Sequence, residues 1–243
     1  MRVLVISDIH ANLAAFEAVL QDAKGKWDQI WCLGDVIGYG PDPNECVALL
    51  REQNHISLSG NHDWAVLGKM DITIFNPEAR KAIEWTRSVV SSESYNYLDS
   101  LPTMIEEAPF TLAHASPRQP VWEYILDIGT AAANFEHFNT PYCLVGHTHV
   151  PILFAEELGS NKILPYGAAN NTPIQLNKRR CIINPGSVGQ PRDSDPRAAY
   201  VLLDTEKLIW EFNRVEYPFR QTQESMRLAG IPVRLARRLE FGW

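Results

Sequence analysis

Short apolar runs alternate with longer amphipathic stretches in the first part of this chain. The runs at Val3–Ile6, Ile30–Leu33 and Ile56–Ser59 predict buried strands, because each is short and ends in polar residues. Between them, residues 12–23 and 44–52 carry apolar side chains at helical spacing. This strand–helix alternation predicts an α/β fold with a parallel sheet and right-handed crossovers.

The middle of the chain, from about residue 64 to 101, has a helical pattern, with Pro77 near a helix start. Trp85, Tyr95 and Tyr97 lie in this segment. Such aromatic residues usually pack helices onto a sheet. The alternative is a cap-like segment over the active site that offers a ring to stack on a nucleobase.

The remainder of the chain is richer in predicted strands, and their close spacing favours an antiparallel component. A helix is predicted over 129–138, and two helices, broken at 230–232, over 218–239. Without an internal repeat or long linker, residues 1–243 are expected to form one domain. The later strands are expected at Phe110–Ala113, Tyr142–Val145, Ile152–Ala155, Cys181–Ile183, Ala199–Leu203 and Leu208–Phe212.

Histidines and carboxylates gather where the predicted strands end. Polar side chains at these ends point into the crevice where α/β proteins place their sites, and metal ions offset the cost of burying them. In Gly146-His147-Thr148-His149, both histidines would share one face if strand geometry persists. The motifs are Asp8-Ile9-His10, Gly34-Asp35, Gly60-Asn61-His62-Asp63, His114 and Gly146-His147-Thr148-His149.

Composition narrows the classes of partner. A formal net charge of −7 argues against a general nucleic-acid or anionic-membrane surface. The four cysteines form no CxxC pair and predict no disulfide framework, which suits a reducing cytoplasm. The amino terminus becomes polar at Ser7-Asp8, too soon for a signal peptide or membrane span.

The ordered motifs resemble those of the calcineurin-like metallophosphoesterases, whose pattern is D-x-H, G-D, G-N-H, a lone H and G-H-x-H. The resemblance implies a four-layer α/β/β/α sandwich with two mixed β-sheets. It also implies two metal ions at the strand carboxyl ends. One would be held by Asp8, His10 and His149, and the other by Asn61, His114 and His147.

In that family pattern, Asp35 bridges the two ions and His62 is the general acid. A carboxylate can bridge ions about 3.5–4 Å apart, and they lower the pKa of bound water. Imidazole and carboxylate ligands suit manganese, iron, nickel and zinc alike, so the identity of the metals stays open. The expected reaction is attack of metal-bound hydroxide on a phosphate ester, with no protein nucleophile.

The second motif departs from that of the protein serine/threonine phosphatases, which is G-D-x-V-D-R-G. Gly38 replaces the aspartate that would orient the general acid, and Tyr39 replaces the phosphate-binding arginine. Asp63, next to His62, is a candidate orienting group, although capping a helix is an equally good role for it. A protein phosphatase is therefore only an alternative.

Arg192 is expected to supply the missing positive charge, because it follows a glycine-containing loop after a predicted strand. Tyr39 is the second candidate substrate-binding residue, and Arg118 is a weaker candidate than Arg192. Alternatively, Arg192 and Asp193 only fix a tight loop.

Segments 34–45 and 184–192 resemble bacterial relatives of diadenosine tetraphosphatases and small phosphodiesterases. This resemblance implies a small phosphorylated substrate, such as a dinucleoside polyphosphate. The alternative from another class is a non-catalytic metal-binding interaction module on the same fold. The C-terminal arginines at 234, 237 and 238 are expected to form a solvated helix face, with a partner surface as the alternative. The sequence leaves the oligomeric state open.

Overall fold

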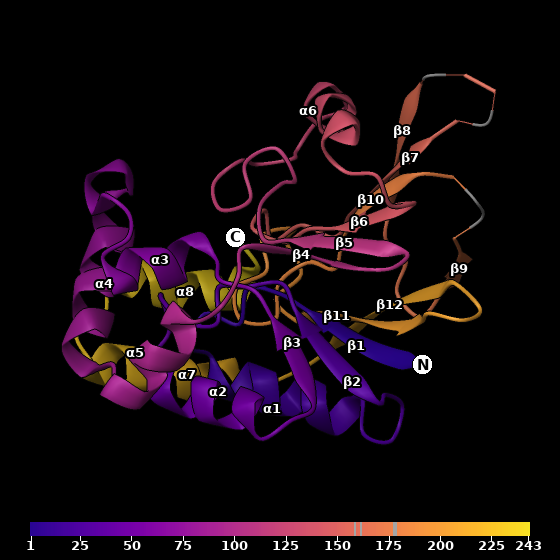
Figure 1. The fold of residues 1–243 in the computed structure, drawn as a ribbon. Coiled ribbons are helices and arrows are strands. Elements are labelled where there is room, and N and C mark those ends of the chain that lie inside the picture. The colour runs from indigo at the N-terminus through magenta and orange to yellow at the C-terminus, as the bar shows by residue number, and fades with distance from the viewer. Residues whose placement is uncertain (158, 161, 177–178) are drawn as a thin grey trace.

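Two six-stranded sheets face each other in this computed structural model, with helices on their outer faces (Figure 1). The structure describes residues 1–157, 159–160, 162–176 and 179–243. This α/β/β/α arrangement of two mixed sheets confirms the expected fold. No helix in these ranges is long and apolar enough to cross a membrane.

The first sheet contains the strands at the start and near the end of the chain, in the order β3-β2-β1-β11-β12-β9. Its first three strands are parallel, and the other neighbours pair antiparallel. The strands are β1 (Arg2–Ile6), β2 (Gln29–Cys32), β3 (His55–Ser57), β9 (Pro173–Gln175), β11 (Ala198–Asp204) and β12 (Ile209–Val215).

The second sheet has the order β4-β5-β6-β10-β7-β8. Here β5, β6 and β10 are parallel, and the outer pairs are antiparallel. The strands are β4 (Met104–Glu107), β5 (Phe110–Ala113), β6 (Tyr142–Leu144), β7 (Ile152–Glu156), β8 (Ile163–Gly167) and β10 (Cys181–Asn184).

Alternation of side chains along the strands divides the core into layers. In β1, Val3 and Val5 join the core between the sheets, whereas Leu4 and Ile6 join the core beneath the helices. Beside the first sheet lie α1 (Leu13–Asp22), α2 (Pro43–Arg51), α7 (Phe219–Leu228) and α8 (Val233–Phe241). On the second sheet lie α6 (Ile128–Asn134) and a 3₁₀ turn (Phe135–His137).

The middle segment forms α3 (Asn61–Leu67), a 3₁₀ turn (Ile72–Ile74), α4 (Pro77–Val89) and α5 (Ser92–Asp99). Trp85, Tyr95 and Tyr97 favour the packing interpretation, whereas Phe75 of the same segment lies against His62. Trp85 packs on the core, the Tyr95 hydroxyl donates to the Leu67 carbonyl at 3.1 Å, and the Tyr97 hydroxyl contacts His55 Nε2 at 2.7 Å.

Three strands escaped the sequence prediction, namely β4, β8 and β9. They carry exposed or half-buried residues at the edges of the sheets, so they lack a continuous apolar run. The helix predicted over 129–138 ends earlier, at Asn134, before the 3₁₀ turn. The last predicted strand begins one residue late, because Leu208 has a left-handed backbone (φ +54°) in the turn before β12.

Candidate metal centre

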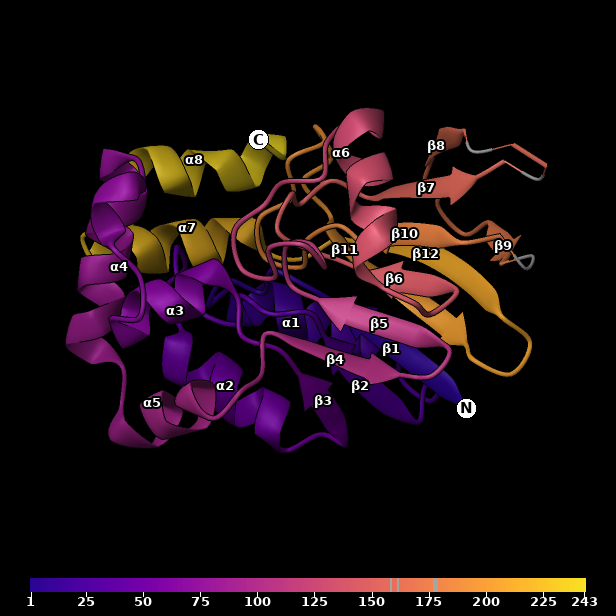
Figure 2. The ribbon, with the colours of Figure 1, turned by 45° about the horizontal axis from the view of Figure 1, so that its top comes forward.

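The motif residues converge at one end of the two sheets, because β1, β2, β5 and β6 all end there (Figure 2). Asn61 and His62 begin α3, which follows β3. All the predicted metal ligands and His62 are buried, at no more than 4 % exposure. These residues are Asp8, His10, Asp35, Asn61, His62, His114, His147 and His149.

Five of these residues adopt the left-handed backbone conformation that L-residues avoid. Their φ angles are +55° for Asp8, +50° for His10, +53° for Asp35, +64° for His147 and +60° for His149. The expectation that His147 and His149 share a strand face is therefore wrong, because β6 ends at Leu144. Such strain costs about 1–3 kcal/mol per residue and concentrates at functional sites.

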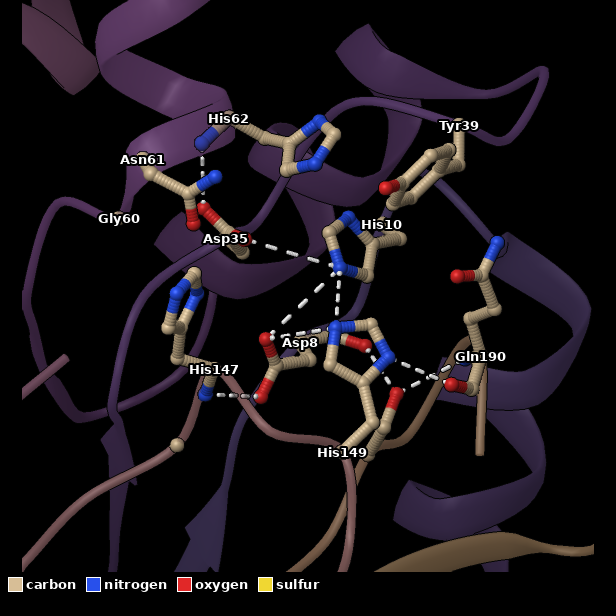
Figure 3. Close-up of polar contacts among 12 residues, drawn as sticks. Asp8, His10, Asp35, Tyr39, Gly60, Asn61, His62, His147, His149 and Gln190 are labelled. Carbon is tan, nitrogen blue, oxygen red and sulfur yellow. Dashed lines mark hydrogen bonds and ion pairs between the residues drawn. The ribbon is translucent and has the colours of Figure 1, made fainter. Parts of the chain in front are cut away.

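Asp8, His10 and His149 form the first group of potential metal ligands (Figure 3). The Nε2 atoms of His10 and His149 lie 3.1 Å apart. Asp8 Oδ1 lies 3.7 Å from His10 Nε2 and 3.3 Å from His149 Nε2. The three side chains thus point into one small space from two distant motifs.

Asp35, His114 and His147 form a second group, and Asp35 connects it to the first. Asp35 Oδ2 lies 3.6 Å from His10 Nε2 and 3.5 Å from His114 Nε2. Asn61 joins this group, with its Oδ1 atom 3.2 Å from His114 Nε2. The carboxylate of Asp35 therefore stands between the two groups.

Backbone carbonyls orient three of the imidazole rings. The Nδ1 atoms contact the carbonyl oxygens of Ile37 (from His10, 3.3 Å), Leu33 (from His114, 2.9 Å) and Gln190 (from His149, 2.6 Å). A proton on Nδ1 in these contacts leaves Nε2 as the free lone pair, as metal-ligating histidines require. His147 is reversed, because its Nε2 contacts the Trp122 carbonyl at 3.1 Å and leaves Nδ1 for ligation.

Two carboxylate oxygens in the centre are buried without a hydrogen-bond partner among the described residues, namely Asp8 Oδ1 and Asp35 Oδ2. These are the atoms that face the histidine Nε2 atoms. Burial would raise the pKa of Asp35, but the charges of His114, His62 and His10 hold it well below its usual range. Ionised, orphaned oxygens amid nitrogen donors fit divalent cations.

His62 lies beside the two groups, and its ring also falls within 4.8 Å of ligand atoms of His10 and Asp35. Its Nδ1 atom is buried and has no hydrogen-bond partner among the described residues. Burial lowers the pKa of His62 to about 4. A nearby phosphate anion would raise this pKa and favour the protonated imidazole.

Asp63 contacts backbone groups and makes no hydrogen bond to His62. It accepts from Gly60 N–H at 2.9 Å and from Ile37 N–H at 3.1 Å. The first contact caps α3, because the carboxylate of its third residue accepts from the N–H of the N-cap residue Gly60. The geometry therefore favours the capping role for Asp63.

Arg192 lies at the rim of the centre and Arg118 does not reach it. The Arg192 Nη2 atom donates to Gln190 Oε1 at 2.9 Å and lies 3.4 Å from the Tyr39 hydroxyl. Arg118 instead forms an ion pair with Glu123. Asp193 pairs with Arg214 of β12, and Arg192 bonds to Gln190 of its own loop, so both residues also hold this loop in place.

Aromatic residues that the sequence analysis missed cover the centre. The Tyr124 ring stacks on His147 with centroids 3.9 Å apart, and Phe75 contacts both His62 and Trp122 at 5.2 Å. Trp122 and Tyr124 lie in the loop after His114. Two aromatic residues in that loop, close to a motif histidine, were the sequence signal that could have indicated this cover.

Comparison with known proteins agrees with this geometry. A family model described as a calcineurin-like phosphoesterase superfamily domain matches residues 1–208. An uncharacterised protein of Methanocaldococcus jannaschii is 41 % identical over 248 residues, covering 99 % of this chain and 98 % of that protein.

Two solved structures are similar to this chain over its whole length. A metallophosphoesterase from Sphaerobacter thermophilus is 48 % identical, with a TM-score of 0.91 over 100 % of this chain and 99 % of that one. A hypothetical protein from Pyrococcus horikoshii shares the fold at 20 % identity, with a TM-score of 0.81 over 100 % and 98 % of the two chains. The motifs, the fold and these matches show that this chain belongs to the calcineurin-like phosphoesterase superfamily and is a phosphoesterase hydrolase.

Proposed function

We propose that this protein hydrolyses a phosphate ester or phosphoanhydride of a small molecule or nucleotide at a centre of two divalent metal ions. The observation that carries the proposal is the position of Asp35 Oδ2, an orphaned oxygen 3.6 Å from His10 Nε2 and 3.5 Å from His114 Nε2. An anionic oxygen between two groups of imidazoles is what a bridging ligand requires.

The proposed ligands follow from the two groups. Asp8, His10 and His149 would hold one ion, and the second would be held by Asn61, His114 and His147, with Asp35 shared. When bound, the ions would neutralise phosphate charge and make water a better nucleophile. Manganese, iron, nickel and zinc all suit this ligand set.

The remaining residues would act on the substrate. His62 would donate a proton to the leaving oxygen, since its ring lies beside both groups without occupying a hydrogen bond at Nδ1. The Arg192 fork at the rim would bind phosphate oxygens, with the Tyr39 hydroxyl next to it. No side chain is required as a nucleophile.

A small substrate suits the covered centre. The potential ligands are almost fully buried, and Trp122 and Tyr124 lie over them. Gly38 also stands where the protein phosphatase pattern has an aspartate, so Nδ1 of His62 has no hydrogen-bond partner among the described residues. These features favour a small phosphorylated molecule, including dinucleoside polyphosphates, over a phosphoprotein.

We also propose a single domain in a reducing compartment such as the cytoplasm. Phe75, Ala79 and Ile83 of the middle segment join the same core as Leu4 and Ile6 of β1, which supports one domain. All four cysteines are buried free thiols, which supports the compartment.

The test is a metal-supplemented activity panel. The purified protein would be loaded separately with manganese, iron, nickel or zinc and offered p-nitrophenyl phosphate, bis-p-nitrophenyl phosphate and diadenosine tetraphosphate. We expect metal-dependent turnover of at least one substrate and its loss in Asp35→Asn. Metal-loaded protein that turns over none of these esters would favour the non-catalytic interaction module.

A further inference from the structure

The C-terminal helix α8 is fixed against the loop that carries Arg192. The Ser194 N–H donates to the Gly242 carbonyl at 2.8 Å. Gly242 has a φ of +68°, and a Cβ atom there would lie 2.7 Å from the Asp195 backbone. Of the α8 arginines, Arg234 and Arg237 are exposed, as expected for a solvated face, whereas Arg238 is half-buried. The end of the helix adjoins the loop that carries Arg192.

α8 also reaches the side of the histidine cluster where Arg192 lies. Leu239 lines a small cavity together with His10, Tyr39 and Gln190. Figure 3 shows Tyr39 and Gln190 on the same side of His10, and Arg192 Nη2 contacts both. Arg238 precedes Leu239 on α8 and is half-buried.

Arg192 and Arg238 influence each other as like charges. The pKa of Arg238 is lowered, first by burial and next by the positive charge of Arg192. No ion pair or side-chain hydrogen bond of Arg238 is found among the described residues. The Nε atom of Arg192 is also buried, and it has no hydrogen-bond partner among the described residues. Two guanidinium groups in this state favour an anion that would contact both.

A cavity of about 140 Å³ adjoins Arg238 and is also lined by Arg234, Leu235, Asn76 and Glu78. A single water needs about 10–15 Å³ on this scale, so the cavity accommodates a group of several atoms. Glu78 lies 3.5 Å from Arg234 and offsets one charge. Arg234 and Arg238 thus share this cavity with one carboxylate, which leaves one positive charge in excess on a protein of net charge −7. Arg192 adds a further positive charge that acts on Arg238.

We propose that Arg192, Arg238 and Arg234 form a subsite for phosphate groups beyond the one that is hydrolysed, so that the preferred substrate carries a phosphoanhydride chain. This proposal rests on the proposed function, because it places the hydrolysed phosphate beside Asp35. The guanidinium fork matches phosphate oxygens, and successive arginines leading from the centre to α8 match successive phosphates.

The first test measures binding without turnover. Calorimetry would compare inorganic tripolyphosphate with orthophosphate on metal-loaded protein, dialysed free of excess metal, in which His62→Gln suppresses turnover in the parent and in both arginine variants. We expect tighter binding of tripolyphosphate and about a tenfold loss of that affinity in Arg238→Gln. The matched control is Arg227→Gln on α7, where the arginine pairs with Glu224 and is 62 % exposed. Equal tripolyphosphate affinity in all three proteins would overturn the subsite.

The second test measures selectivity. In Arg238→Gln, kcat/KM for diadenosine tetraphosphate is expected to fall about tenfold further than kcat/KM for p-nitrophenyl phosphate. Arg238→Lys keeps the charge without the fork and is expected to lie between wild type and Arg238→Gln. An equal loss on both substrates would contradict the subsite. If wild type hydrolyses neither substrate, the proposed function fails, and the binding test still decides the subsite.

Discussion

The imidazole ring of His62 rests directly on the backbone of Gly38, where an added Cβ atom would lie 2.7 Å from Nδ1. Packing therefore orients this ring in place of the aspartate of the protein phosphatase pattern. The rings of Tyr39, His10 and Phe75 surround it, with centroids 4.2, 4.9 and 5.2 Å away. Aromatic rings thus enclose His62 on the side where the protein phosphatase pattern would place an aspartate.

Gly38→Ala is expected to displace His62 and lower kcat by about 100-fold, because small misplacements of a reacting group are costly. Gly38 also has a φ of +93°, so the variant loses about 1–3 kcal/mol of stability from strain and overpacking. Turnover, metal content and thermal unfolding would be measured together.

Gly25→Ala is the matched control for this change. Gly25 has a φ of +75°, but nothing lies within 4 Å of an added Cβ atom. It should lose about 1 kcal/mol of stability and no turnover. If Gly38→Ala and Gly25→Ala lower kcat equally, contact with His62 does not matter for the reaction.

The polar motifs at predicted strand ends indicated that these residues would meet, and the resemblance to the calcineurin-like family implied their division into two groups. The sequence could not predict their backbone conformation. His147 and His149 appeared to continue a strand, yet both adopt positive φ angles after β6 has ended. The surrounding tertiary structure imposes that conformation, and no local propensity signals it.

Contacts between distant segments could not be predicted from the sequence either. Tyr124 stacks on His147, and Leu239 of α8 shares a cavity with His10. Both depend on how a loop and a terminal helix pack against the sheets. The sequence therefore predicted a solvated face for all three α8 arginines, whereas Arg234 and Arg237 are exposed and Arg238 is half-buried.

Asp35→Asn is expected to weaken metal binding by more than about 100-fold. The reason is that even the loss of a residue that only hydrogen-bonds to a metal ligand lowers the metal affinity by about 10–100-fold. Elemental analysis after dialysis would measure the metal content. Asp63→Asn is the matched control, since Asp63 is also buried but contacts backbone N–H groups. It should lower the unfolding temperature and keep the metal. Metal loss in both variants would contradict a specific role for Asp35.

His62→Gln is expected to lower kcat by about 10²–10⁴-fold for an alkyl phosphate, because its leaving oxygen needs a proton. The loss should be smaller for p-nitrophenyl phosphate, whose leaving group is a weak base. Steady-state rates on both substrates, with metal analysis, would test this. Loss of metal would show instead that His62 is a ligand, a role that its proximity to His10 and Asp35 also permits.

Glu123 holds the loop over the centre, and its ionisation gives a pH signature. It pairs with Arg118 and accepts hydrogen bonds from Ser116 and Asn134, and the Arg118 contact comes first in lowering its pKa from 4.5 to about 2. A lowered carboxyl pKa stabilises the fold above pH 4.5, and this stability is lost as the pH falls toward 2. Glu123→Gln should therefore cost about 1–2 kcal/mol at pH 7.

Thermal unfolding of wild type and Glu123→Gln between pH 3 and 8 would check this linkage. The difference in unfolding temperature should be constant above about pH 5 and shrink below it, because wild type then loses the contribution that the variant never had. Glu206→Gln, at an exposed ion pair with the amino terminus, provides the control and should show a much smaller difference. A Glu123→Gln difference that stays constant down to pH 3 would mean that the carboxylate charge does not hold the loop.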